Sequence, residues 1–289
     1  MDITHDSGPH TSSDPTFTET WYWNTIDPKS GSVVWAHLSW LPAQRRGQHL
    51  VAVVSPAGVQ RERVETKEPL KSELLEVDIV TPWHAAHIRS KVLDIDVRWE
   101  AFHDAVDFGE LLHVDKTLAL KHYESGGRAE GTIRGVRFSA PGWRDRSFGP
   151  RNVRRFGHHW AIGMIGVERD VMLTASVMWP DQQQAAAPPV VYGCVYDQGR
   201  QAVYNTGITS IRNRDGSPAQ FRMPDQTSIA LDISKSIGET RFILDPNSAP
   251  ATDLTEDPVY ALRDIYLQAS SPTLGPLVGW YEEGVRWTN

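Results

Sequence analysis

Apolar and polar residues alternate along most of the chain, and short groups of turn-forming residues interrupt the alternation. From Thr18 to Trp40 the sequence TETWYWNTIDPKSGSVVWAHLSW contains two apolar runs on either side of DPKSG. In the second run, alternate positions are occupied by Val34, Ala36, Leu38 and Trp40. A period of two is typical of a half-buried strand, and Asp, Pro, Ser and Gly favour turns. The pattern therefore predicts a β-hairpin.

The hairpin pattern recurs along the chain. Turn signals lie at Pro56-Ala57-Gly58, Arg134-Gly135, Asp197-Gln198-Gly199 and Ser236-Ile237-Gly238. The segments VYALRDIYLQAS and LVGWYEEGVRW add two more strands near the end. Residues 101–120 have some apolar spacing of three and four, as in a short helix, but Gly109 interrupts it. We predict about fourteen to sixteen strands in an antiparallel all-β fold of sandwich or barrel type.

That number of strands exceeds one eight-stranded barrel, so we expect two β-rich units. The most linker-like segment is QQQAAAPP, from Gln182 to Pro189. We predict a disordered N-terminus over residues 1–17, an N-terminal β-domain over 18–181 and a C-terminal β-barrel domain over 190–289.

Composition narrows the classes of partner. The chain of 289 residues is 40% hydrophobic and 22% charged, which is typical of a globular protein. Its formal net charge of -7 repels phosphate backbones, so we expect no nucleic-acid partner. The polar start MDITHDSGPHTSSDPT does not resemble a signal peptide, and we find no apolar run of about 18 residues, the length of a membrane span. We expect a cytoplasmic protein in which the single cysteine, Cys194, is a buried, inert thiol.

A charged cluster occupies residues 142–163, GWRDRSFGPRNVRRFGHHWAIG, at a predicted strand end and the loop that follows. Its five arginines and single aspartate cannot all pair locally. The arginines face solvent, pair with distant acids, or line an anion or polar substrate site. Asp145 lies between two arginines: an ion pair would lower its pKa, whereas burial without a partner would raise it and favour proton donation.

Histidines and acids near this cluster offer further candidates. His158 and His159 are adjacent on a strand, so only one of them faces a given pocket. No spacing demands the three or four ligands of a zinc site, and we predict no metal. In HYESGGRAEGTIRG, residues 122–135, we expect a tight turn at Gly126-Gly127. The strand after it carries an exposed charged face, or Glu124 or Glu130 reaches a barrel mouth.

Eleven tryptophans are spread over the predicted strands. Many belong to the core, but aromatic side chains at this density also suit a cavity that holds an apolar ligand. The aromatic candidates for such a cavity are Trp23, Trp40, Trp143 and Trp160.

HYESGGRAEGTIRG, GWRDRSFGPR and FGHHWAIG together resemble the AttH-like and carotenoid 1,2-hydratase (hydroxyneurosporene synthase) superfamily, in its uncharacterised bacterial branch. The hairpin TETWYWNTIDPKSGSVVWAHLSW is similar to the N-terminal hairpin of such members. The likeness covers much of residues 18–165 and departs at Phe148, where we expect tryptophan. It implies two consecutive lipocalin-like (calycin) β-barrels, or a barrel and a β-sandwich, around an apolar pocket.

The resemblance also implies chemistry. Members hydrate isoprenoid double bonds, and relatives cyclise or isomerise hydrophobic natural products. Carried onto this chain, it makes Asp145 the first candidate for acid or electrostatic work. The other candidates beside the substrate are Tyr123, Arg146, Arg151, His158 and His159.

We therefore expect a lyase (hydro-lyase), isomerase or cyclase that needs no cofactor and acts on a lipophilic isoprenoid, steroid or polyketide-like molecule by acid/base chemistry. The alternative is a lipocalin-type carrier that holds such a molecule without reaction. An ester hydrolase is not supported, because the chain has no GxSxG elbow. The sequence leaves the oligomeric state open.

Overall fold

The computed structural model describes residues 2–109, 113–115, 118–151, 156–180, 189–205, 207–212, 218–223, 228–244 and 260–285. These residues form 22 β-strands and two 3-10 helices, η1 (Ile3–His5) and η2 (Pro42–Gln44). The all-β fold predicted from the alternation is confirmed. Within the described ranges, no helix has the length and apolar character needed to cross a membrane.

The first sheet has ten antiparallel strands in the order β4-β3-β2-β1-β12-β11-β7-β6-β5, with β8 paired to β11. Its strands are β1 (Phe17–Asp27), β2 (Ser32–Leu41), β3 (Arg46–Ser55), β4 (Gly58–Thr66), β5 (Glu76–Thr81), β6 (Ala85–Ser90), β7 (Ile95–Ala101), β8 (Val106–Asp107), β11 (Lys121–Ile133) and β12 (Val136–Pro150). The long central strand β12 carries Arg144, Asp145 and Arg146 of the charged cluster, and β1 and β11 pair with it on either side.

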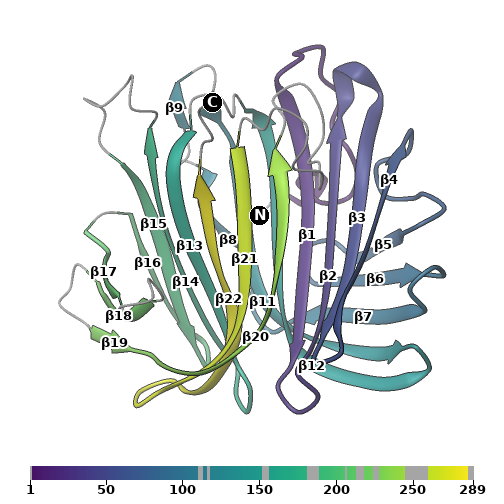
Figure 1. The fold of residues 1–289 in the computed structure, drawn as a ribbon. Helices are drawn as coiled ribbons and strands as arrows, with labels where there is room; N and C mark the ends of the chain where they lie inside the picture. Colours follow the sequence, from purple (N-terminus) through teal and green to yellow (C-terminus); the bar gives the residue numbers. More distant parts are fainter. Residues whose placement is uncertain are drawn as a thin grey trace.

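The second sheet has seven antiparallel strands in the order β16-β15-β14-β13-β22-β21-β20. They are β13 (Phe156–Gly166), β14 (Val171–Pro180), β15 (Val190–Asp197), β16 (Arg200–Tyr204), β20 (Asp232–Leu244), β21 (Tyr260–Ser271) and β22 (Gly275–Val285). Two small sheets contain β9 (His113–Asp115) with β10 (Leu118–Ala119), and β17 (Thr209–Arg212) with β18 (Pro218–Arg222) and β19 (Ser228–Ala230). Figure 1 shows the two large sheets curled and side by side.

Strand pairing divides the chain between β12 and β13. The first sheet ends at Pro150 and the second begins at Phe156. β13 and β14 therefore belong to the second sheet, although both lie within the first predicted domain, residues 18–181. The predicted linker at 182–189 lies outside the described residues except for Pro189. The domain boundaries themselves stay a prediction.

Several predicted turns are present. Arg134-Gly135 joins β11 to β12 with φ angles of 53° and 70°, and Gln198-Gly199 joins β15 to β16 with 48° and 89°. Two positive φ values in succession match the type I′ turn of a tight hairpin, in which glycine relieves strain at the second position.

Other local predictions were wrong. Ser236 to Gly238 lies within β20, where the pairing with β21 is irregular, and the described part of 101–120 forms short strands. Gly126 and Gly127 lie inside β11 rather than in a turn. A Cβ at Gly126 would come within 2.6 Å of the Phe102 ring, so this glycine permits close packing.

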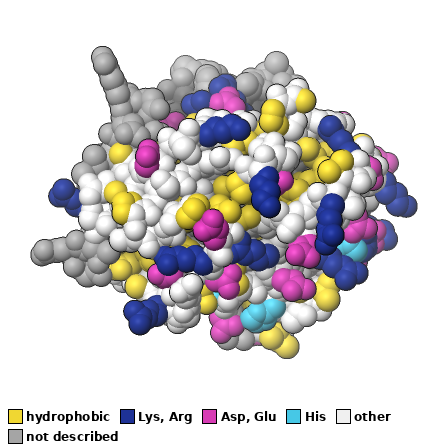
Figure 2. Space-filling model, turned by 90° about the horizontal axis from the view of Figure 1, so that it is seen from below, with side chains coloured by type: hydrophobic (Ala, Val, Ile, Leu, Met, Phe, Trp, Pro, Cys, Tyr) yellow, Lys and Arg dark blue, Asp and Glu magenta, His cyan; other side chains and the backbone are white. Residues whose placement is uncertain are grey.

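Side-chain alternation places three large apolar clusters on the two sheets, and a small fourth cluster contains Trp83, Ala105, Tyr123 and Phe148. One lies on the face of the first sheet that turns away from the second, around Trp21, Trp23 and Trp99. Another lies on the corresponding face of the second sheet, around Trp160 and Phe221. The third combines residues of both sheets, including Tyr22, Trp143 and Trp280, and so holds the sheets together. On the face seen from below, basic and acidic side chains are interspersed (Figure 2).

Two buried ion pairs lie on the face of the first sheet that turns away from the second sheet. Arg144 pairs with Asp6 and lies 5.1 Å from the Trp23 ring, while Arg146 pairs with Glu19. Asp6 is fully buried and also accepts a hydrogen bond from the backbone N–H of Trp83 at 2.5 Å. The segment that we expected to be disordered is therefore held in the structure at Asp6, because a buried guanidinium requires a counter-charge.

We predict that Asp6→Asn lowers the free energy of unfolding by about 3–5 kcal/mol, because it leaves the buried Arg144 cation without its partner. Urea denaturation measures the loss. Asp104→Asn is the matched control: its side chain is 82% exposed, and we expect a change of about 0.5 kcal/mol or less. A loss below about 1 kcal/mol for Asp6→Asn would show that this pair does not anchor the N-terminal segment.

Candidate active site

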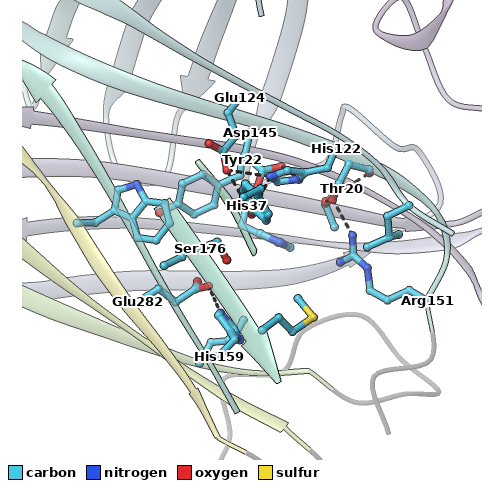
Figure 3. Close-up of a pocket in the computed structure, with 17 residues that line it drawn as sticks. Thr20, Tyr22, His37, His122, Glu124, Asp145, Arg151, His159, Ser176 and Glu282 are labelled. Atoms are coloured by element: carbon cyan, nitrogen blue, oxygen red, sulfur yellow. Dashed lines mark hydrogen bonds and ion pairs between the residues drawn. The ribbon is translucent and has the colours of Figure 1, made fainter. Parts of the chain in front are cut away.

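A cavity of about 150 Å³ lies between the two large sheets, and both sheets contribute its walls (Figure 3). The first wall comes from β1, β2, β11 and β12, and the second from β13, β14, β15, β21 and β22. The polar lining residues are Thr20, Tyr22, His37, His122, Glu124, Asp145, Ser147, Arg151, His159, Ser176, Tyr192 and Glu282.

Strand register arranges the polar groups of the first wall in rows. Tyr22 of β1 lies directly opposite Asp145 of β12, and Asp145 lies opposite Glu124 of β11. Because directly opposed residues point to the same side of a sheet, all three reach the cavity. The next row, two residues along each strand, contains Thr20, Ser147 and His122.

The second wall carries a matching row. Tyr192 lies opposite Ser176, Ser176 opposite Ala161, and Ala161 opposite Glu282. The row continues from Glu282 to Asp264 on β21. Tyr192, Ser176 and Glu282 of this row therefore face the polar side chains of the first wall across one cavity.

His122 is the centre of an acid/base cluster on the first wall. Its Nε2 lies 2.8 Å from Glu124 Oε1 and 3.2 Å from the Tyr192 hydroxyl, and its Nδ1 lies 3.7 Å from Asp145 Oδ1. Burial alone would lower the pKa of His122, but the carboxylates of Asp145 and Glu124 outweigh it and raise the pKa above its ordinary value. The raised pKa favours the protonated imidazole.

Asp145 reaches into the cavity, and 28% of its side-chain surface stays accessible to a ligand. Burial raises its pKa, which His122 and Arg151 lower in part and Glu124 raises further. Its Oδ1 is buried without a hydrogen-bond partner. Of the two alternatives for this residue, the structure favours a desolvated carboxyl group over an aspartate paired with its sequence neighbours, since Arg144 and Arg146 point to the opposite face.

On the second wall, His159 Nε2 lies 2.6 Å from Glu282 Oε1. Burial lowers the pKa of His159 to about 4, so the ring is neutral near pH 7. Burial raises the pKa of Glu282 to about 7, and Asp145 and Glu124 contribute to the rise. Aromatic rings close this side, where Trp280 meets Tyr22 and Trp143 edge to face at 6.2 and 6.0 Å between ring centroids.

Four of the residues predicted from sequence line the cavity: Glu124, Asp145, Arg151 and His159. The others lie elsewhere. Tyr123, Arg146, Trp23 and Trp40 are on the opposite face of the first sheet, and Trp160 belongs to the separate core of the second sheet. Trp143 contacts Trp280 edge to face but is not among the residues that line the cavity. His158 is exposed and stacks on Trp179.

Sequence reasoning missed His122, Tyr22, His37, Tyr192 and Glu282 as lining residues. The spacing of His122 and Glu124, two residues apart on one strand, was a usable signal for a shared face. Glu282 had no such signal, because only the pairing of β22 with β13 brings it to the cavity. In the part of the chain that the structure describes, no group of three or more His, Cys, Asp or Glu side chains is arranged to hold a metal ion.

A sequence profile described as a domain of unknown function (DUF7064) matches residues 4–233, which is most of the chain. The chain belongs to this family. No curated protein matches the sequence of this DUF7064 member.

Solved structures establish the fold. A Nitrosomonas europaea protein provisionally assigned as AttH has a TM-score of 0.61 at 13% identity, covering 100% of this chain and 97% of its own. CghA has a TM-score of 0.61 at 9% identity, covering 95% and 89%. Kievitone hydratase from Nectria haematococca has a TM-score of 0.58 at 11% identity, covering 100% and 93%. The predicted AttH-like, lipocalin-type fold is confirmed.

We predict that Gly163→Ala disturbs the cavity, because a Cβ there would lie 2.8 Å from Trp280 Nε1 and 3.1 Å from the Trp143 ring. The expected loss of stability is about 1–3 kcal/mol, as for other overpacked cores. Urea denaturation and the near-UV circular dichroism of the tryptophans measure the effect. Gly8→Ala, which meets no atom within 4 Å, is the control and leaves both unchanged. Equal behaviour of the two variants would contradict tight contact of the sheets at Trp280.

Proposed function

We propose that this protein is an acid/base enzyme that needs no cofactor: a hydratase, isomerase or cyclase acting on a lipophilic isoprenoid, steroid or polyketide-like substrate. One observation carries the proposal: Asp145, Glu124 and His122 on one wall face Glu282 and His159 on the other across a cavity with aromatic sides. Burial raises the pKa of Asp145 and raises that of Glu282 to about 7, and buried acids with such shifts are suited to proton transfer.

The chemistry proceeds by proton transfer to and from carbon. A protonated carboxyl group donates its proton to an alkene or enol, and the π faces of Trp280 and Tyr22 stabilise the positive charge that develops. Water, or a nucleophile within the substrate, then completes the reaction. The carboxylates and imidazole of the first wall accept the released proton.

The size of the cavity limits what enters it. A cavity of about 150 Å³ holds a group about as large as benzene, so the reacting part of an isoprenoid or steroid fits while the remainder extends beyond these walls. Leu120, Ala161, Met178 and Leu262 supply apolar contacts to that part. The hydratase named among the structural neighbours supports this class of reaction.

We predict that Asp145→Asn lowers turnover by about 10²–10⁴-fold while ligand binding persists, because the amide keeps the shape but cannot transfer the proton. Farnesol, a polyene and a steroid enone are incubated with the protein in D₂O, and mass spectrometry measures deuterium on product carbon. This readout detects hydration, isomerisation and cyclisation alike. Tryptophan fluorescence quenching by the same compound measures binding.

Asp104→Asn, on the surface, is the control and retains full activity. Unchanged deuterium incorporation in Asp145→Asn would contradict the role of this residue. If the wild-type protein binds a compound tightly but incorporates no deuterium into any of them, the alternative holds. That alternative is a lipocalin-type carrier, which the apolar side chains of the cavity also favour.

A further inference from the structure

The second wall contains a pair of buried carboxyl groups. Asp264 on β21 and Glu282 on β22 lie directly opposite each other in the antiparallel register, on the same face of the sheet. Side chains so placed have Cβ atoms about 5 Å apart. Asp264 is fully buried, and Glu282 keeps 17% of its side-chain surface accessible toward the cavity. Two negative charges this close, away from water, repel strongly, so one carboxyl group retains a proton.

We infer that Asp264 and Glu282 share one proton, and that Glu282 donates it to the substrate while the His122, Glu124 and Asp145 cluster across the cavity acts as the base. The inference deepens the proposed function and rests on it. Asp264 does not line the cavity, so it is a positioning residue that acts through Glu282.

Hydrogen bonds orient the two carboxyl groups. The Tyr22 hydroxyl donates to Asp264 Oδ2 at 3.3 Å, and Asn24 Nδ2 donates to that hydroxyl at 2.9 Å. On the other carboxyl group, His159 Nε2 and Glu282 Oε1 are hydrogen-bonded at 2.6 Å. Asp264 Oδ1 is buried without a hydrogen-bond partner, and a proton shared with Glu282 satisfies it.

The groups around the pair support this protonation state. Burial and the neighbouring Glu282 hold the pKa of Asp264 well above its ordinary value, and Glu282 itself loses its proton at a pKa of about 7. An acid with that pKa is well matched to proton donation near neutral pH. The titratable groups that act on the pair are Tyr22, His122, Glu124, Asp145, His159, Tyr192 and Tyr266.

With Glu282 as the acid and Asp145 as the base, atoms and charges balance for the hydration of an alkene. The Glu282 proton bonds to one alkene carbon with the π electron pair, and the other carbon becomes a cation beside Trp280. A water oxygen bonds to that carbon and gives a proton to the Asp145 carboxylate. One water is added in total, and the proton returns from Asp145 to the carboxyl pair through solvent.

Infrared spectroscopy of protein with isotopically labelled carboxyl groups tests proton sharing without any substrate. We expect a protonated-carboxyl band at pH 6 that disappears as the pH rises through about 7. In Glu282→Gln, Asp264 loses the neighbour that raises its pKa, so Asp264 ionises at lower pH and its band shifts to lower pH. In Asp264→Asn, Glu282 loses the hydrogen bond of the Asp264 carboxyl group that lowers its pKa, so the Glu282 band persists to higher pH. Glu283→Gln, at the next position on β22, is the control and keeps the band.

Activity tests the catalytic part of the inference. In Asp264→Asn the alkaline limb of the deuterium-incorporation profile should move to higher pH, by the same displacement as the Glu282 band. An unchanged band in both Asp264→Asn and Glu282→Gln overturns proton sharing, even if the enzyme is active. A band that behaves as expected with an unmoved pH profile overturns the role of Glu282 as acid. Failure of the proposed function is distinguished from both of these outcomes, because in that case the wild-type protein itself incorporates no deuterium.

Discussion

The contact between the two curled sheets is the constraint on which the remaining structure depends. It removes a set of carboxyl and imidazole groups from bulk water, and burial is the largest influence on the pKa values of Asp145, His122 and Glu282. Without that burial these residues would be ordinary surface acids and bases. Gly163 matters for the same reason, since a larger residue would collide with the tryptophans that hold the sheets together.

Alternation along β12 separates two kinds of chemistry that are interleaved in the sequence. Arg144 and Arg146 point to one face, where Asp6 and Glu19 neutralise them. Asp145 points to the other face, toward the cavity. Among the described arginines of the charged cluster, Arg151 alone lines the cavity, so acidic and neutral groups dominate there. This balance favours neutral ligands with hydroxyl groups over anionic ones.

Local patterns in the sequence were enough for part of this picture. The hairpins and the prominence of Asp145 followed from alternation and from the charged cluster. The register of distant strands could not be predicted from local patterns, because strands that pair or contact each other are far apart in the sequence. Tyr22 and Asp264, for example, are hydrogen-bonded but 242 positions apart. The glycines of β11 also read as a turn, because a glycine needed for close packing looks the same in sequence as one needed for a turn. Glu282 was therefore beyond sequence reasoning although it lies on a predicted strand, whereas the spacing of His122 and Glu124 was a signal that could have been used.

The central claim is that ligand binds between the sheets rather than inside the curl of the first sheet. Anomalous diffraction from crystals soaked in 4-bromophenol tests it most directly, because this neutral ring is close to the size of the cavity and its hydroxyl group can donate to a carboxylate. The account predicts a bromine peak within the cavity, beside Trp280 and between Asp145 and Glu282. A peak found only near Arg144 on the opposite face of the first sheet, or only on the molecular surface, would contradict it.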